Sequence, residues 1–286
     1  MPTFVLLDTE TTGASEEDRI IQLAFLALTG REVKAYDDYC KPPLPIKYGA
    51  MAVHNITPEM VESKPPYRET EAARALETLN LPENVLVIQN APFDLGMLAK
   101  EGFTWKGKLI DTLRCAKHLL PELESHGLQY LRYALGFYKT EGEEAKKLGV
   151  EIRAHDALGD VLVLKMLMSH IVNLADRDIG KLVELTNTPI LLPHFRFGKY
   201  KNEPLEALAK KDRGYLEWAL ANMDLDEDMR YSIKRRLVEA ILEKAAAGVP
   251  ASPADLPFLS WAREGSAPLP ECDPEEIARA YARAGG

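Results

Sequence analysis

The order of hydrophobic and polar residues predicts alternating strands and helices over the first 180 residues. Three runs rich in β-branched and apolar residues, at 3–10, 19–28 and 31–40, predict three strands in an antiparallel meander. The continuously apolar run at 84–89 predicts a strand buried on both faces. Helical patterns follow at 92–102, 111–120, 126–136 and 156–172. Together these elements predict an α/β domain with a mixed sheet flanked by helices.

The remainder of the chain has a different pattern. Residues 181–194, which contain two prolines, are expected to link the first domain, residues 1–180, to a small unit at 195–247. That unit is expected to be mostly helical, with a hairpin turn at Gly198 and a long amphipathic helix from about Asp226 to Ala246. Six prolines after Gly248 predict a partly disordered tail over residues 248–286.

Composition narrows the class of protein without deciding its function. The apolar fraction of 46% suffices for a core, and no apolar run approaches the length needed to span a bilayer. Three widely spaced cysteines, and an N-terminus without the pattern of a signal peptide, favour a cytoplasmic protein without disulfides or membrane. A net charge of −9 speaks against a nucleic-acid partner. The sign is weak evidence, because carboxylates gathered around metal ions would contribute to it.

Two carboxylates come directly after the first predicted strand core. Asp8 and Glu10 are two residues apart, so on a strand their side chains point to the same face. Like charges at the edge of an apolar core are costly unless they are paired or bind metal. The pair therefore indicates a candidate metal site.

Further polar residues stand at the ends of predicted elements. Asp94 lies in the first turn of a predicted helix, His155 precedes Asp160 by five residues, and His54 comes just before a predicted helix start. Each has a structural explanation when taken alone: Asp94 would complement the helix dipole, Asp160 would be a solvated helix residue, and each histidine would cap or stabilise a turn.

Taken together, these residues and their neighbours form a pattern more specific than any one of them alone. The motifs DTETTG, HNIT, NAPFD, DTL and HDALGD stand in the order found in the DEDD exonuclease superfamily, and the chain resembles its histidine-bearing, DnaQ-like branch over about residues 3–172. The resemblance implies a ribonuclease H-like sheet flanked by helices. Asn55 departs from the pattern, since the family often has glycine after that histidine. Residues 195–218 resemble a small helical module appended to some exonuclease X-like proteins.

The resemblance implies a set of site residues. Asp8, Glu10, Asp94 and Asp160 would hold two Mg²⁺ ions, for which Mn²⁺ could substitute, because Mg²⁺ takes hard oxygen ligands. His155 would be the general base. On an ideal helix His155 and Asp160 would lie about 140° apart, so His155 is expected in the loop or distorted turn before the helix. A second group of residues would line the pocket for the 3′-terminal nucleotide: Thr11, His54 and Asn90.

The implied activity is 3′→5′ hydrolysis of DNA to nucleoside 5′-monophosphates, with a nucleic acid carrying a free 3′ end as partner. Three alternatives stay open: an RNA-trimming exonuclease similar to RNase T, a proofreading subunit bound to a DNA polymerase or repair complex, and a nucleic-acid-binding protein without activity. The basic and aromatic segment at 195–201 fits either contact with single-stranded nucleic acid or aromatic packing beneath the following helices.

Overall fold

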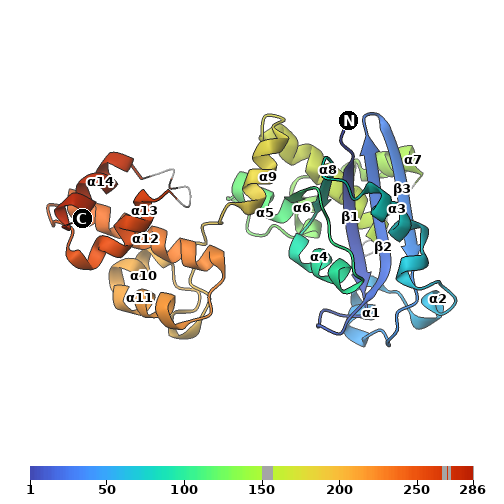
Figure 1. The fold of residues 1–286 in the computed structure, drawn as a ribbon, viewed down its shortest axis with the longest axis horizontal. Helices are drawn as coiled ribbons and strands as arrows, with labels where there is room; N and C mark the ends of the chain where they lie inside the picture. The colour runs from blue at the N-terminus through green and yellow to red at the C-terminus, as the bar shows by residue number, and fades with distance from the viewer. Residues whose placement is uncertain (150–156, 266–268, 270–271, 286) are drawn as a thin grey trace. The chain divides into compact units, whose positions relative to one another are not determined.

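The computed structural model describes residues 1–149, 157–265, 269 and 272–285 (Figure 1). The chain divides into two compact units, Met1–Thr186 and Asn187–Gly286. The helix α9 (Ile179–Asn187) occupies the first half of the segment that was expected to be a linker. Each unit has its own core and is described separately.

A mixed five-stranded sheet forms the centre of the first unit, in the order β3-β2-β1-β4-β5. The first three strands are an antiparallel meander, as predicted, and β4 and β5 are parallel to β1. The expected α/β sheet is confirmed, but the sequence did not predict β5. The strand bounds are β1 Phe4–Thr11, β2 Ile20–Thr29, β3 Glu32–Tyr39, β4 Val85–Ile88 and β5 Lys108–Asp111.

Helices cover both faces of this sheet, and strand β1 supplies both cores. Val5 and Leu7 pack with α3 and α4 on one face. Leu6, which points the other way, packs with α5, α6 and α8 on the opposite face. The helices of this unit, besides α9, are α1 Tyr48–His54, α2 Pro58–Val61, α3 Glu71–Leu79, α4 Ala91–Lys100, α5 Thr112–Leu119, α6 Leu128–Ala134, α7 Glu141–Leu148 and α8 Ala157–Leu174. Single turns of 3₁₀-helix lie at η1 Tyr67–Glu69 and η2 Phe137–Lys139.

By length and composition, α8 is the one described helix that could cross a membrane. This corrects the prediction that no apolar run is long enough, since α8 has 18 residues of high mean hydropathy and only two of them, Asp160 and Lys165, carry a carboxylate or an ammonium group. Half of that stretch is buried inside the unit, where Val161, Leu164 and Leu167 pack against the sheet. We therefore interpret α8 as the core helix of the domain.

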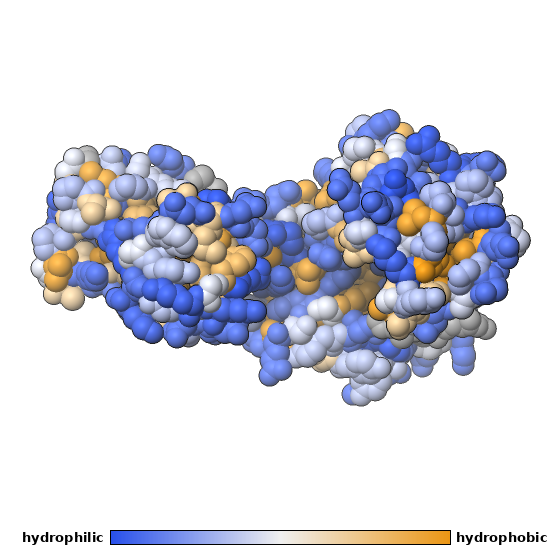
Figure 2. Space-filling view, turned by 90° about the horizontal axis from the view of Figure 1, so that it is seen from below, coloured by the Kyte–Doolittle hydropathy of each residue, from blue (hydrophilic) through white to orange (hydrophobic). Residues whose placement is uncertain are grey.

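The second unit is helical, and its longest helix is α12, whose bounds agree with the long helix predicted from about Asp226 to Ala246 and whose N-cap is Asp226. The apolar stripe of α12 is buried, with Ile233 and Leu237 in its centre. Hydrophilic residues cover most of the face drawn in Figure 2, where apolar residues appear only in small patches. The elements of this unit are η3 Gly198–Tyr200, α10 Leu205–Lys211, α11 Arg213–Asn222, α12 Glu227–Ala246, η4 Pro253–Asp255, α13 Leu256–Arg263 and α14 Pro274–Arg283.

The proline-rich region after Gly248 differs from the disordered tail that was expected. Its described residues form α13 and α14, whose Leu259 and Ile277 are buried against α12. Pro257 and Pro274 stand in the first turns of these helices. Proline is favourable there because the first amides of a helix have no intrahelical acceptor.

The segment at 195–201 packs mainly against its own unit. Phe195 is buried and its ring contacts those of Phe197 and Tyr215. The ammonium of Lys199 lies 4.5 Å from the ring centroid of Tyr200 and pairs with an Asp212 carboxylate. These contacts favour aromatic packing over a free surface for single-stranded nucleic acid.

Candidate active site

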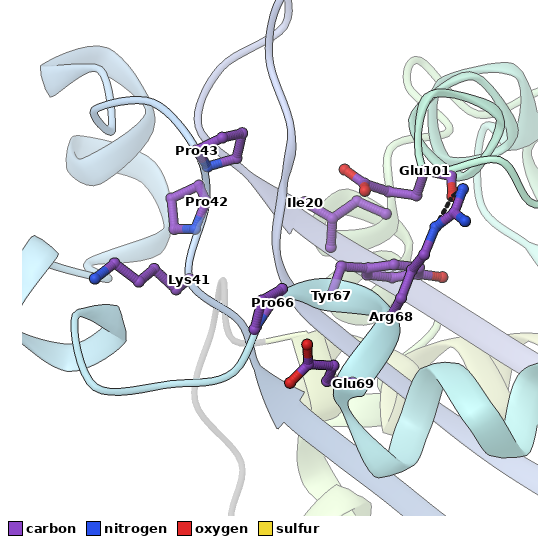
Figure 3. A pocket seen from close by; sticks show the side chains of 9 residues that line it. All are labelled: Ile20, Lys41, Pro42, Pro43, Pro66, Tyr67, Arg68, Glu69 and Glu101. Atoms are coloured by element: carbon purple, nitrogen blue, oxygen red, sulfur yellow. Dashed lines mark hydrogen bonds between the residues drawn. The ribbon is translucent and has the colours of Figure 1, made fainter.

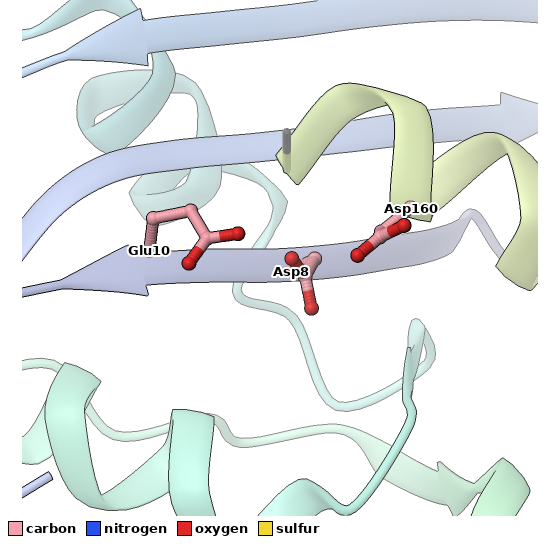
Figure 4. Close-up of side chains that lie close together, drawn as sticks. All are labelled: Asp8, Glu10 and Asp160. Carbon is pink, nitrogen blue, oxygen red and sulfur yellow. The ribbon is translucent and has the colours of Figure 1, made fainter. Parts of the chain in front are cut away.

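Three carboxylates meet where β1 passes the beginning of α8. Asp8 and Glu10 lie on the same face of β1, as the period of two predicted, and Asp160 reaches them from the first turn of α8 (Figure 4). One oxygen of each lies within 4.8 Å of one oxygen of each of the others, and all three side chains are half-buried. The cluster consists of oxygen donors only, a set suited to hard divalent cations such as Mg²⁺ or Mn²⁺. These residues could therefore hold a divalent metal.

Asp94 is not a member of this group. It lies in the first turn of α4, on the face of β1 opposite to Asp8 and Glu10, and its Oδ1 accepts a hydrogen bond of 2.7 Å from the Thr9 hydroxyl. Burial raises the pKa of the Asp94 carboxyl, and the hydrogen bonds from Thr9 offset that rise only in part. Of the four carboxylates expected to converge, the structure therefore brings three together in one group.

The turn that leads into α4 is fixed by Asp111. One Asp111 oxygen accepts a hydrogen bond from the backbone amide of Asn90 and the other accepts from that of Ala91, each at 3.1 Å. The same carboxylate caps α5 by accepting from Leu113. Asn90 itself adopts a left-handed conformation, with φ 66° and ψ 54°. The sequence included Asp111 in a motif without giving it a role, and its carboxylate shapes the turn that carries Asn90.

Thr11, the last residue of β1, is brought together with His54. The His54 Nδ1 accepts from the Ile56 amide at 2.9 Å, so Nε2 carries the proton and donates to the Thr11 carbonyl at 3.2 Å. Burial lowers the pKa of His54, which keeps the ring neutral. Asn55, which follows, has φ 59°. It adopts the left-handed conformation that glycine would adopt there, and asparagine tolerates it better than most residues.

His155 lies outside the described residues, so its expected position before α8 stays a prediction. A residue that the sequence did not indicate, Gln129 on α6, donates a hydrogen bond of 2.6 Å to Asp160 Oδ1. The two are 31 positions apart, and no local pattern in the sequence connects them.

A separate cavity of about 520 Å³ lies near the start of β2 (Figure 3). Its lining includes Pro42, Pro43 and Tyr67, and Arg68 donates two hydrogen bonds to the Glu101 carbonyl beside it. None of the predicted site residues lines this cavity.

Comparison with known proteins identifies both parts of the chain. Residues 5–168 match the family model described as exonuclease, and residues 195–224 match the one described as exodeoxyribonuclease X-like C-terminal. The chain belongs to the exonuclease family. The DnaQ-like exonuclease resemblance inferred from the motifs is thereby confirmed, and the sheet is mixed and flanked by helices as expected.

Individual relatives of this exonuclease cover different parts of it. Exodeoxyribonuclease 10 of Escherichia coli (strain K12) is 29% identical over 242 residues, which cover 81% of this chain and 97% of the relative. The DNA polymerase III subunit epsilon-like protein of Rhodobacter capsulatus is 34% identical over 169 residues, but these are only 22% of that protein. Among solved structures, exonuclease X in complex with 5′ overhanging duplex DNA matches with a TM-score of 0.49 and 24% identity, over 65% of this chain and 99% of that one.

Proposed function

We propose that the protein is a divalent-metal-dependent 3′→5′ exodeoxyribonuclease that releases nucleoside 5′-monophosphates. The observation that carries the proposal is the cluster of Asp8, Glu10 and Asp160 within an exonuclease domain. DNA is favoured as the substrate because exodeoxyribonuclease 10 is similar to this chain over both units, including the C-terminal one.

The three carboxylates would hold the cation, with Mg²⁺ as the first choice and Mn²⁺ as a substitute. A divalent cation in such a site supplies positive charge against the phosphodiester and its leaving oxygen. The like charges of Asp8 and Glu10 are thereby compensated when the site is loaded. Asp94 accepts a hydrogen bond from Thr9 on the opposite face of β1. Its carboxylate would add negative charge near the cation from outside the group of three.

The remaining residues would handle the proton and the substrate. His155 would take the proton from the attacking water, because an imidazole can titrate near the operating pH. Thr11 and Asn90 would contact the terminal nucleotide. Both ring nitrogens of His54 are engaged within the protein, so His54 would act by holding the Thr11 backbone in place.

The test uses oligonucleotides labelled at the 5′ end, as matched single-stranded DNA and RNA, each with a free or a blocked 3′ end. The proposal expects stepwise shortening of DNA with a free 3′ end in Mg²⁺, none in EDTA, and none with a blocked 3′ end. Shortening of 3′-blocked DNA would contradict the direction, and preferential shortening of RNA would contradict the substrate.

A polymerase partner is a second candidate, favoured by the similarity to the epsilon-like protein and to PolC-type polymerases. Those matches cover only 12% of the PolC-type polymerase and 22% of the epsilon-like protein, whereas exodeoxyribonuclease 10 is covered over 97% of its length. The protein is therefore expected to act without a polymerase. Co-purification of a DNA polymerase with the tagged full chain, together with activity only in that complex, would favour the proofreading role instead.

A further inference from the structure

We infer that Gln129 is a positioning residue for the metal site, and this inference rests on the proposed function. Gln129 lies on α6 and donates from Nε2 to Asp160 Oδ1 at 2.6 Å. This is slightly shorter than the usual range for an N–H···O hydrogen bond, and bonds to a charged carboxylate are among the shorter ones. The bond restrains the rotation of the Asp160 carboxylate.

The orientation of the Gln129 amide is itself determined by a neighbour. Arg132, three residues further along α6 and on the same side of the helix, donates from Nη1 to Gln129 Oε1 at 3.1 Å. An arginine only donates, so the amide oxygen must face Arg132 and the amide nitrogen must face Asp160.

Arg132 is held in turn by the first residue of α7. Its guanidinium forms a two-pronged pair with Glu141, in which Nε donates to Oε2 at 2.6 Å and Nη2 donates to Oε1. Both side chains are largely buried, and the hydrogen bonds from Arg132 to Glu141 raise the pKa of the guanidinium. The chain of contacts thus runs from Glu141 through Arg132 and Gln129 to Asp160.

The order of charges along this series of contacts, from Glu141 to Asp160, is suited to a metal site. Arg132 is paired with Glu141, and the hydrogen bond from α6 to Asp160 comes from the neutral amide of Gln129. An arginine in direct contact would compete with the cation for the Asp160 carboxylate. A neutral donor orients the carboxylate and leaves its negative charge to the cation. The apolar contacts of α6 with the core include the buried Leu131 and the partly buried Leu128.

The direct test is Gln129→Met, which keeps the approximate volume and removes the donor. Binding of Mn²⁺ to the full chain is measured by calorimetry without nucleic acid. The Kd for Mn²⁺ is expected to rise about 10- to 100-fold, the usual effect of losing a residue that orients a ligand. Tyr130→Met is the matched control, because Tyr130 is 37% exposed on the same helix and outside the chain of contacts. A Kd in Gln129→Met equal to that of the wild type would overturn the inference.

A second variant protects the test against misfolding. Gln129→Asn keeps the amide but is one methylene shorter, so it cannot span the distance from Arg132 to Asp160. It should weaken Mn²⁺ binding as Gln129→Met does, with a melting temperature in EDTA close to that of the wild type. Unchanged Mn²⁺ affinity in this folded variant would contradict the inference in the same way.

A double-mutant cycle tests whether Arg132 acts on Asp160 through Gln129. Arg132→Met should weaken Mn²⁺ binding in the wild type, but it should add no further loss when Gln129 is already methionine. Fully additive losses would contradict an action through Gln129.

Turnover provides a separate readout. In Gln129→Met, more Mn²⁺ should be needed for half-maximal activity, saturating Mn²⁺ should restore turnover, and the KM for DNA should not change. Because the calorimetry needs no substrate, a wild type without exonuclease activity would refute the proposed function and still leave the inference about Gln129 tested.

Discussion

The carboxylate cluster of the first unit and the ion-pair network of the second unit arrange charged side chains in opposite ways. In the first unit, three carboxylates lie within reach of one another around Asp8. In the second unit, acidic and basic groups alternate in ion pairs: Arg213 pairs with Glu217 and Asp255, and Lys210 pairs with Glu206 and Glu243.

The difference shows which of the two arrangements serves stability. Opposite charges that pair within a unit stabilise its fold or leave it unaffected. Like charges held together reduce stability unless a cation binds, so their presence in a folded domain indicates function. The predictions below test this distinction, from the largest expected effect to the smallest.

Replacement of one clustered carboxylate should separate activity from stability most clearly. Asp8→Asn should lower exonuclease activity by about a thousandfold or more, which corresponds to roughly 4 kcal/mol of transition-state stabilisation. In EDTA it should leave the melting temperature unchanged or raise it, because a like-charge contact is removed. Steady-state kinetics and calorimetry in EDTA measure the two effects. A strong loss of stability would mean that Asp8 supports the fold.

Loss of the general base should reduce turnover without changing the affinity for the metal ion. His155→Ala should lower kcat about 10²- to 10⁴-fold, the usual contribution of a general base, and leave Mn²⁺ affinity in place. Single-turnover kinetics and Mn²⁺ calorimetry on the same preparation measure both. Wild-type turnover in this variant would remove His155 from the mechanism.

The reverse pattern is expected for an ion pair of the second unit. Arg235 is 4% exposed and donates to Glu239 at 2.8 Å and to the Tyr231 hydroxyl at 3.2 Å. Arg235→Ala should destabilise this unit by about 3 kcal/mol, because the packing of the buried guanidinium and its hydrogen bonds to Tyr231 and to the partly buried Glu239 are lost. Urea unfolding followed by the fluorescence of Trp218 and Trp261 measures this loss. Activity per folded molecule should not change, and a large loss of activity in the folded variant would contradict the division of roles.

The smallest effect concerns a paired carboxylate within the first unit. Burial by itself would raise the pKa of Asp18, but hydrogen bonds from Lys47, Ser15 and Thr12 outweigh it and hold the pKa well below the ordinary 3.8. The resulting stabilisation is present above the ordinary pKa and is lost as the pH falls through the folded-state value. Thermal melting at decreasing pH should show this component in the wild type and not in Asp18→Asn. Identical pH profiles would show that Asp18 does not contribute.

The sequence predicted the parts of the site that depend on short-range geometry. The common face of Asp8 and Glu10 follows from the alternation of side chains on a strand. The family motif added Asp160, which lies 150 positions further along the chain. The placement of Asp94 across β1 could not be predicted, because it depends on where the first turn of α4 meets the end of the sheet.

Other features were missed for identifiable physical reasons. Strand β5 is only four residues long and begins with an exposed lysine, so it lacks a strand-like pattern of its own. The burial of Arg235 on α12 has no local sequence signal, because it depends on neighbouring elements such as α13, whose Trp261 lies against Tyr231. The prolines after Gly248 predict disorder by their number alone, but Pro257 and Pro274 stand in the first turns of helices. In each case the outcome depends on contacts with elements distant in the sequence.

The most direct test of the central claim, that the carboxylate cluster is a cation site, is calorimetric unfolding of the wild type and Asp8→Asn with and without Mn²⁺. In the wild type, Mn²⁺ at 100 times its Kd should stabilise the first unit by about 2.7 kcal/mol, and EDTA should reverse the effect. In Asp8→Asn the same concentration should cause little or no stabilisation. An equal stabilisation of both proteins would contradict the claim.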